Sequence, residues 1–246
     1  MKNKSITLEV CADSLCNALT AQSAGADRIE FCANLPEGGV TPSFGQISLA
    51  RKMLNIRLFV LIRPRGGDFL YNGTEYEIMK ADIRLCGEKG CDGVVVGMLN
   101  VDGTVDTIRC RELVNIAHQY GMKVTFHRAF DRCSDLFSAM ENIIDLGCER
   151  ILTSGGFESA IDGADVIKKL IEKADGKIII MPGAGITPDN VGNIIEKTGA
   201  TEIHGTFRSP VASKMEYKNP IFSDKPEEYF FNATDANKIK KILSEN

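Results

Sequence analysis

The sequence predicts a (β/α)8 barrel of the TIM type, and three observations support this fold class. Short apolar runs recur eight times along the 246 residues, and most of the intervals between them have the length and boundary residues of one helix. Alternating strands and helices are typical of right-handed βαβ crossovers and a parallel sheet. Eight such units in about 250 residues match a closed barrel. A doubly wound open sheet is the alternative, but it has no natural use for eight similar units. We therefore expect one domain over residues 1–246.

The first half of the chain contains four of the expected strands, and capping residues mark the helices between them. The strands are residues 5–10, 27–31, 56–62 and 92–97. Asp13 can cap the first helix, which we expect to end at Gly25, and Ser43 opens the second helix. The Thr74–Glu77 spacing predicts a capping box for a third helix that ends near Gly90.

The second half of the chain repeats this arrangement four more times. The expected strands are residues 122–127, 149–153, 177–181 and 201–205. Ser134 precedes a helix over residues 135–146, which Gly147 ends. Thr187–Pro188 has the form of an N-cap followed by proline at the first helical position, and Gly199 ends that helix.

The last forty residues break the pattern. Residues 207–232 are polar and rich in proline and aromatic residues, which predicts a long loop before a final helix near residues 234–244. Loops of this length are usually functional or interfacial. Four aromatic residues predict burial against a neighbouring chain, although a lid over the barrel is an equal alternative: Phe222, Tyr229, Phe230 and Phe231.

Composition and charge limit the classes of partner. The net charge is −4 and the basic residues form no block, which argues against nucleic acid as a bulk electrostatic partner. No apolar run has the length of a membrane span, and the N-terminal apolar run is too short for a signal peptide. We therefore expect a cytoplasmic location.

The chain contains eight cysteines, which is many for a cytoplasmic protein. No two of them form a Cys-x-x-Cys pair, and their spacing matches no zinc site. Six are expected to be reduced, buried packing residues: Cys16, Cys86, Cys91, Cys110, Cys133 and Cys148.

Glutamate and cysteine recur two residues apart at the ends of the first two expected strands. Glu9 and Cys11 share one strand face, as do Glu30 and Cys32, because side chains alternate along a strand. Adjacent strands lie about 4.8 Å apart, so an aligned register would bring Cys11 and Cys32 together at the barrel mouth. Two convergent thiolates suit a soft ion such as Cu(I). The alternative is that both are small packing residues.

Ionisable residues also close the fifth and eighth expected strands. The fifth strand ends in His127 and Arg128, and the eighth ends in His204. Charged groups at buried strand ends are costly unless they are paired, and ligands bind at this end of the strands in a barrel. The unperturbed pKa of histidine lies near neutrality. We therefore expect His127 to be the main proton-transfer group, and Arg128 and His204 to contact a ligand.

Two arginines follow the third expected strand. Arg63 and Arg65 can donate bidentate hydrogen bonds to a carboxylate or phosphate of a ligand. Alternatively, they form ion pairs with Glu9, Glu30 or Glu202, whose charges need compensation. Glu30 and Glu9 are also candidate catalytic residues.

Small residues follow three further strands. Gly183 and Gly185 lie after the seventh strand and Thr206 after the eighth, where barrels of this type commonly bind phosphate. Glycines let backbone N–H groups approach an anion, although every tight turn also needs them. Ser154 and Gly155 close the sixth strand and join the expected anion-binding set. No lysine ends a strand, which disfavours Schiff-base chemistry.

These segments together resemble the CutC family of copper homeostasis proteins. The resemblance runs from about residue 6 to 210, and seven segments carry it: Leu8–Cys11, Ala26–Cys32, Glu37–Ser43, Ile62–Phe69, Thr125–Asp131, Arg150–Gly155 and Met181–Ile186. It implies a TIM barrel, a cytoplasmic location, a homo-oligomer such as a dimer or tetramer, and copper handling with Cys11 and Cys32 as Cu(I) ligands.

Three functions are consistent with these residues. The first is Cu(I) binding through Cys11 and Cys32, as the resemblance implies. The second is an enzyme that acts on a small anionic metabolite, with His127 as the acid or base. The third is a non-catalytic oligomeric scaffold.

Overall fold

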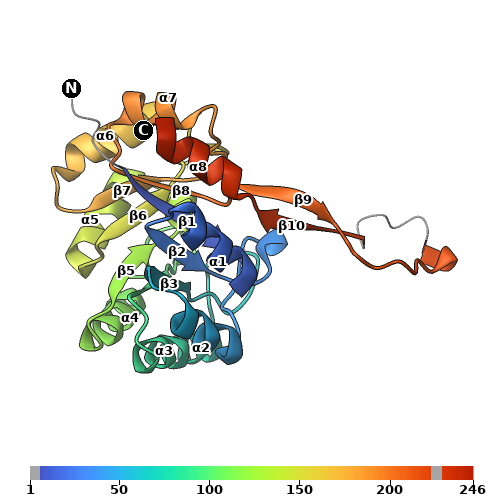
Figure 1. Ribbon diagram of the computed structural model, residues 1–246. Helices are drawn as coiled ribbons and strands as arrows, with labels where there is room; N and C mark the ends of the chain where they lie inside the picture. Colours follow the sequence, from blue (N-terminus) through green and yellow to red (C-terminus); the bar gives the residue numbers. More distant parts are fainter. Residues whose placement is uncertain (1–5, 223–228, 246) are drawn as a thin grey trace.

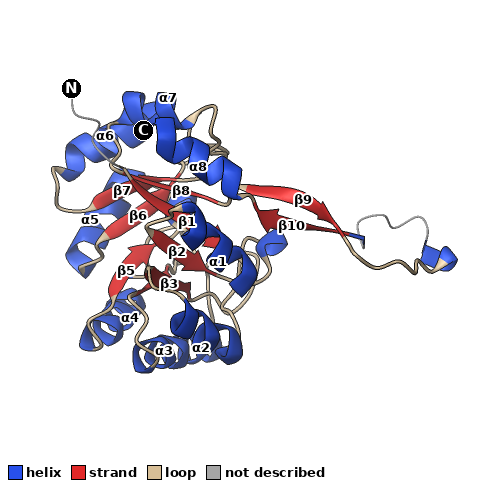
Figure 2. Ribbon diagram, in the orientation of Figure 1, coloured by secondary structure: helices blue, strands red, loops and turns tan. Residues whose placement is uncertain are grey.

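Eight parallel strands form the wall of a nearly closed barrel (Figures 1 and 2). The computed structural model describes residues 6–222 and 229–245. The strands pair in the order β7-β6-β5-β4-β3-β2-β1-β8, and β7 lies beside β8. The predicted fold class is confirmed, and all eight expected strands are present: β1 (Thr7–Ala12), β2 (Arg28–Phe31), β3 (Arg57–Leu61), β4 (Gly93–Val96), β5 (Lys123–Phe126), β6 (Arg150–Thr153), β7 (Ile179–Pro182) and β8 (Glu202–Gly205).

Helices surround the barrel on its outside, as Figure 2 shows. They are α1 (Leu15–Ala24), α2 (Phe44–Met53), α3 (Gly73–Glu88), α4 (Thr107–Gln119), α5 (Leu136–Leu146), α6 (Ala164–Ala174), α7 (Val191–Thr198) and α8 (Ala236–Glu245). Two short 3-10 helices, η1 (Leu35–Glu37) and η2 (Phe130–Arg132), follow β2 and β5. None of the helices in the described ranges has the length and apolar character that crossing a membrane requires.

Strand alternation separates two apolar clusters. Leu8 and Val10 of β1 belong to the large core between the strands and the surrounding helices. Cys11, the next residue of the same strand, belongs to a small cluster inside the barrel with Phe59 and Leu61 of β3. Because successive side chains point to opposite faces, Glu9 also points into the barrel. The alternation of side chains along each strand therefore decides which residues point into the barrel and can form a site there.

Several predicted helix ends are confirmed. Ser43 caps α2 and forms a capping box with Gln46. Gly25, Gly147 and Gly199 follow α1, α5 and α7 with φ of +103°, +88° and +74°. These left-handed backbone conformations strain residues with a Cβ, which explains why glycine ends the three helices.

Other expected caps are wrong by one to three residues. Ser14 caps α1, whereas Asp13 accepts a hydrogen bond from the Asn17 side chain. The helix expected to begin at Thr187–Pro188 instead begins after Asn190, whose side chain accepts a hydrogen bond from the Thr187 N–H. These polar residues lie close together in the sequence, so more than one of them could have provided the cap.

The caps of α3 and α5 are also shifted. The expected Thr74–Glu77 box does not form, because Asn72 and Glu75 form a capping box two residues earlier. Asp135 caps α5, whereas the prediction started this helix after Ser134. The boundary errors leave the barrel order unchanged.

The predicted loop over residues 207–232 is wrong in part, because both of its ends form strands of a two-stranded antiparallel sheet. β9 (Arg208–Ala212) pairs with β10 (Phe230–Thr234), and η3 (Pro220–Phe222) lies between them. In Figure 1 this hairpin extends away from the barrel. The expected final helix is confirmed as α8, which packs against α1.

A network of charged side chains lies inside the barrel. Arg28 of β2 donates hydrogen bonds to Glu9 of β1 and, at 2.5 Å, to Glu202 of β8. Arg150 of β6 donates to the same Glu202 carboxylate at 3.2 Å. The two guanidinium groups stack over the Phe59 ring at 5.1 and 5.0 Å from its centroid. Arg28, Arg150, Glu9 and Glu202 are therefore each paired with an opposite charge, as burial in a low dielectric requires.

Candidate functional site

A pocket of about 640 Å³ opens at the carboxyl ends of the strands. Eight of the expected site residues line it: Cys11, Glu30, Arg63, His127, Arg128, Gly185, His204 and Thr206. Six others do not: Glu9, Cys32, Arg65, Ser154, Gly155 and Gly183. Charged and polar groups from five different strands thus converge on one cavity, which is the usual place for ligands in this fold.

The two expected metal-binding thiols are close together. Cys11 Sγ lies 3.7 Å from Cys32 Sγ, and both residues are buried. Cys11 lines the pocket, whereas Cys32 lies behind it in the apolar cluster with Leu61. The Cys32 thiol and burial raise the pKa of Cys11 well above its ordinary value. The Cys11 thiol is therefore protonated at neutral pH unless a metal displaces the proton.

The strand register differs from the aligned arrangement that the Glu-x-Cys repeat predicts. Cys11 lies opposite Glu30 rather than opposite Cys32, so β2 is offset by two residues. An offset of two keeps the same strand face inward. On the other side of β1, Glu9 lies opposite His204 of β8. The register therefore brings the thiol of Cys11 to the Glu30 carboxylate, and the imidazole of His204 to Glu9.

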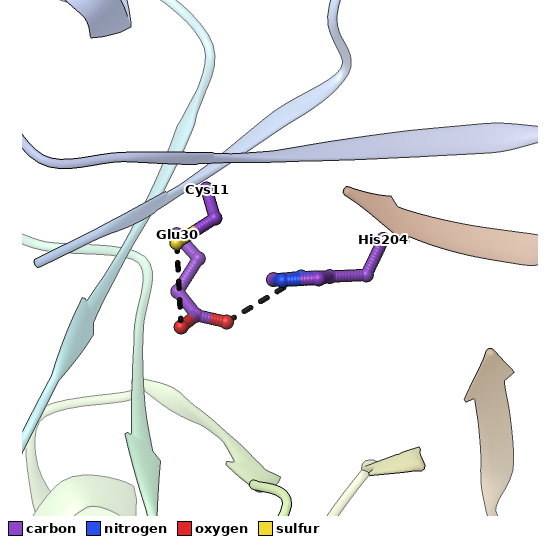
Figure 3. A group of neighbouring side chains, drawn as sticks. All are labelled: Cys11, Glu30 and His204. Atoms are coloured by element: carbon purple, nitrogen blue, oxygen red, sulfur yellow. Dashed lines mark hydrogen bonds and ion pairs between the residues drawn. The ribbon is translucent and has the colours of Figure 1, made fainter. Parts of the chain in front are cut away.

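Cys11, Glu30 and His204 form a compact group, shown in Figure 3. Cys11 Sγ is 4.0 Å from Glu30 Oε1, and His204 Nδ1 is 3.5 Å from Glu30 Oε2. His204 Nδ1 is also 2.8 Å from Glu9 Oε1. In Figure 3 the imidazole ring points toward the carboxylate of Glu30. Glu9 therefore contacts the imidazole of His204 but does not line the pocket.

The two glutamates of this group have opposite electrostatic environments. Burial alone would raise the pKa of Glu9, but Arg28 and His204 outweigh it and lower the pKa to about 2. Burial raises the pKa of Glu30 to about 7, and Glu9 adds to this effect against His204 and Arg28. Glu30 and Glu9 raise the pKa of His204 in spite of its burial. Glu30 therefore titrates near neutral pH, and the raised pKa of His204 lets its imidazole keep a proton to a higher pH than an ordinary histidine.

His127 has a different character from the expected proton-transfer group. Burial and the charge of Arg63 lower the pKa of His127 to about 3. Its Nδ1 accepts a hydrogen bond from the Ala129 N–H at 3.1 Å, and its Nε2 has no partner within the described residues. The ring packs against Phe69 at 4.8 Å between centroids. His127 is therefore neutral at physiological pH and offers an N–H donor.

Arg63 lines the pocket, but it forms no ion pair with the barrel glutamates. Its guanidinium group donates to the carbonyl oxygens of Glu37, Gly39 and Gly67 at 3.0, 2.7 and 2.7 Å. It thereby holds the loop after β2 against the loop after β3. The predicted ion pair of Arg63 with Glu9, Glu30 or Glu202 is wrong, because Arg28 and Arg150 neutralise Glu9 and Glu202 instead.

Arg65 lies outside the pocket. It pairs with Glu75 at 2.6 Å and with Asp68 at 2.9 Å. Asp68 lies in the loop after β3, and Glu75 lies in the first turn of α3. The expected ligand contact of Arg65 is therefore replaced by a local ion-pair cluster.

The Asp131 carboxylate occupies the position that we expected an external anion to fill after β6. It accepts hydrogen bonds from the backbone N–H groups of Ser154 and Gly156 and from the Arg128 guanidinium group. Gly155 donates its N–H to Thr153. The donors of Ser154 and Gly155 are thus satisfied within the chain. Arg128 also donates to the Ser154 hydroxyl at 2.7 Å.

The loops after β7 and β8 retain free donors. The N–H groups of Ala184, Gly185 and Thr206 donate to no acceptor within the described part of the chain, and all three residues line the pocket. Gly183 instead serves packing, because a Cβ there would lie 2.5 Å from the Leu152 side chain. These donors form the part of the expected anion site that stays open.

Sequence reasoning did not identify three site-related arginines. Arg28 and Arg150 neutralise the buried acids, and Arg132 of η2 lines the pocket without an ion pair to any described residue. Strand alternation offered one signal, because Arg28 lies two residues before Glu30 and so shares its inward face. The cysteines bring one further correction. All eight are free thiols, but Cys16 is exposed and Cys133 is only partly buried, whereas both were expected to be buried.

Comparison with known proteins assigns the family. The sequence model of the CutC family matches residues 6–209. The chain belongs to the CutC family. A human copper homeostasis protein cutC homolog is 46% identical over 239 residues, covering 96% of this chain and 87% of the human protein. A CutC family protein of Parabacteroides distasonis is 47% identical over 241 residues, covering 96% of this chain and 98% of that protein.

Solved structures agree with this assignment. The crystal structure of a CutC protein from Streptococcus agalactiae matches with a TM-score of 0.78 and 38% identity, covering 82% of this CutC chain and 98% of that one. Phosphoribosylanthranilate isomerase from Thermotoga maritima matches with a TM-score of 0.58 and 14% identity, covering 97% of each chain. The second likeness concerns the barrel fold alone.

Glu30→Gln should change how stability depends on pH. The pKa of Glu30 is about 7 in the folded protein against 4.5 ordinarily, so the folded state binds more protons between these values. Wild-type stability should therefore fall as pH rises through this window. Glutamine removes the titrating group, so the variant should match wild type near pH 4.5 and melt several degrees higher at pH 8, since about 1 kcal/mol corresponds to about 2–4 °C.

Thermal melts of wild type and variant from pH 4.5 to 8 test this expectation. Glu158→Gln, which changes an exposed glutamate, is the matched control and should melt like wild type throughout. A difference between Glu30→Gln and wild type that stays constant with pH would contradict the assignment of the raised pKa to Glu30.

Proposed function

We propose that this CutC protein binds Cu(I) between Cys11 and Cys32. One observation carries the proposal: two buried sulfurs lie 3.7 Å apart, and one of them lines a pocket open to solvent. Soft thiolates are preferred ligands of Cu(I). Curated relatives are named copper homeostasis proteins, which supports the same ligand. We also propose that the protein handles copper in the cytoplasm, where thiols stay reduced.

The surroundings of the two thiols favour a metal that competes with protons. The pKa of Cys11 is raised, so its thiol keeps its proton at neutral pH when no metal is bound. Cu(I) must displace the Cys11 proton, and its affinity should therefore increase with pH. The apolar cluster around Cys32, which includes Phe59 and Leu61, excludes water from one side of the site.

Reduced wild-type protein should bind about one Cu(I) per chain, and Cys11→Ser combined with Cys32→Ser should abolish this binding. Serine keeps the size of the side chain but removes the soft ligand. Competition with a chromogenic Cu(I) chelator measures the affinity. Cys16→Ser is the control for an exposed thiol and should behave as wild type. Equal Cu(I) affinity of the double variant and wild type would exclude the site.

A second candidate function is an enzyme for a small anionic metabolite. The free N–H groups of Ala184, Gly185 and Thr206 favour it, since they can hold a phosphate or carboxylate at one side of the pocket. Glu30 lines the same pocket and has a pKa of about 7, which suits a general acid or base. His127 would then donate a hydrogen bond through Nε2 to a substrate oxygen.

Inorganic phosphate should bind this pocket, and Arg132→Ala should weaken binding several-fold. Arg132 lines the pocket and has no ion-pair partner among the described residues, so its charge is available to an anion. Gly185→Asp should abolish binding, because it adds a carboxylate beside the free N–H groups. Isothermal titration with phosphate measures both effects. Arg57→Ala, at the opposite end of β3, is the matched control. Unchanged affinity in both pocket variants would contradict the anion site.

We further propose that the β9–β10 hairpin is an oligomer contact rather than a lid. No residue of the hairpin lines the pocket among the described residues. Phe230 and Phe231 are consecutive in β10, so they lie on opposite faces, and they are 56% and 57% exposed. An isolated two-stranded hairpin is marginally stable in water. Exposed aromatic rings on both faces therefore favour a covering chain.

Sedimentation velocity should show a dimer or tetramer for wild type. Phe230→Ser combined with Phe231→Ser should shift it toward the monomer, because both faces of the hairpin lose apolar contact area. Ile108→Ser, on the exposed surface of α4, removes an apolar side chain elsewhere and should leave the assembly intact. A monomeric wild type at micromolar concentration would refute the contact.

A further inference from the structure

We infer that Cys11, Glu30 and His204 form a site for a divalent transition-metal ion of the zinc class, with a position open to a substrate oxygen. The inference goes beyond the Cu(I) proposal, because it shares Cys11 with that site but does not use Cys32. The three side chains come from β1, β2 and β8, which are neighbours in the barrel wall.

The spacing of the candidate ligand atoms matches such an ion. One ligand atom from each of the three residues lies within 4.8 Å of the others, and all three residues are buried. The Cys11 Sγ to Glu30 Oε1 distance is 4.0 Å, and a ring nitrogen of His204 lies within 4.8 Å of the ligand atoms of both other residues. Zinc bonds of about 2.0–2.3 Å in a tetrahedron separate ligand atoms by about 3.3–3.8 Å. Small side-chain rotations therefore suffice to close the site.

A second, independent observation points to a cation. Glu30 is 5% exposed, and its Oε2 has no hydrogen-bond partner among the described residues. A buried carboxylate oxygen without a donor is costly. The contacts inside the barrel provide two guanidinium groups, and these bind Glu9 and Glu202. Glu30 is left as the third carboxylate without a guanidinium partner, and a metal cation would supply the missing positive charge.

Glu9 supports His204 in the way expected of a residue behind a metal ligand. Its Oε1 lies 2.8 Å from His204 Nδ1, and Arg28 holds the other oxygen of the carboxylate. A carboxylate on one ring nitrogen keeps the proton there and leaves the other nitrogen free to bind a metal. Glu9 is fully buried and ion-paired, so it stays charged and orients the imidazole.

The pocket above the three residues gives this site a catalytic rather than a structural form. Structural zinc sites are closed by four protein ligands, whereas catalytic sites keep one position for water or substrate. All three ligand residues line the cavity of about 640 Å³, so an ion held between them would have one side open to this cavity. The His127 Nε2 donor and the free N–H groups of Ala184 and Gly185 line the same cavity. An oxygen-bearing anionic substrate could therefore bind both the ion and these donors.

Co(II) is the probe that separates this site from the thiol pair, because its spectrum reports ligand type. Reduced, metal-free wild type titrated with Co(II) should show a thiolate-to-metal charge-transfer band and the visible bands of a four-coordinate ion. Glu30→Gln and His204→Gln should each lower the Co(II) affinity at least tenfold. Cys32→Ser should keep the sulfur charge-transfer band and the bands of a four-coordinate ion, and Zn(II) should displace Co(II) from wild type. Cys16→Ser controls for binding at an exposed thiol.

Two outcomes would overturn the inference. One is a wild-type spectrum without a sulfur charge-transfer band. The other is Co(II) binding that persists in Glu30→Gln and His204→Gln but disappears in Cys32→Ser, which would assign the ion to the thiol pair. Thermal melts of each variant verify folding. Cu(I) titration of the same variants distinguishes the two sites, because Cu(I) binding should depend on Cys32 and survive Glu30→Gln.

Discussion

The ion pair between Glu9 and Arg28 is the interaction on which the rest of the site depends. Both side chains are fully buried in the barrel, and the pair lies between β1 and β2 directly behind the pocket. Glu9 also contacts His204, so a single carboxylate fixes the orientation of a guanidinium group and an imidazole ring. Breaking a buried pair leaves an uncompensated charge and costs about 3–5 kcal/mol. The pair therefore both stabilises the barrel wall and orients the imidazole ring of His204.

The number of guanidinium groups near the buried acids explains why Glu30 has a raised pKa whereas Glu9 has a lowered one. Arg28 and Arg150 satisfy Glu9 and Glu202, and Phe59 occupies the space against their planar faces. Glu30 lines the pocket, which Glu9 and Glu202 do not, and its Oε2 has no hydrogen-bond partner among the described residues. Its carboxyl group consequently keeps a proton to about neutral pH or accepts a cation. The charge of Glu30 thus depends on what enters the pocket.

Sequence alone predicted the barrel and eight of the residues that line the pocket, because both follow from local patterns. Apolar runs of strand length and the glycines after helices identify elements, and strand ends identify the binding face. The partners of individual charges did not follow, because they depend on long-range register. Arg63 binds carbonyl groups and Arg65 binds Glu75, although both were plausible partners of the barrel acids. Likewise, the Asp131 carboxylate occupies the backbone donors that seemed available after β6.

The two-residue offset between β1 and β2 links the two ligand sets of the pocket. In an aligned register, Cys11 would lie opposite Cys32, and Glu30 would lie opposite Glu9. The observed register places Cys11 opposite Glu30, while its sulfur remains 3.7 Å from Cys32. Cys11 can therefore complete a soft pair with Cys32 or a mixed set with Glu30 and His204. Ligand softness would then decide the occupant, since Cu(I) prefers two sulfurs and zinc-class ions accept sulfur, nitrogen and oxygen together.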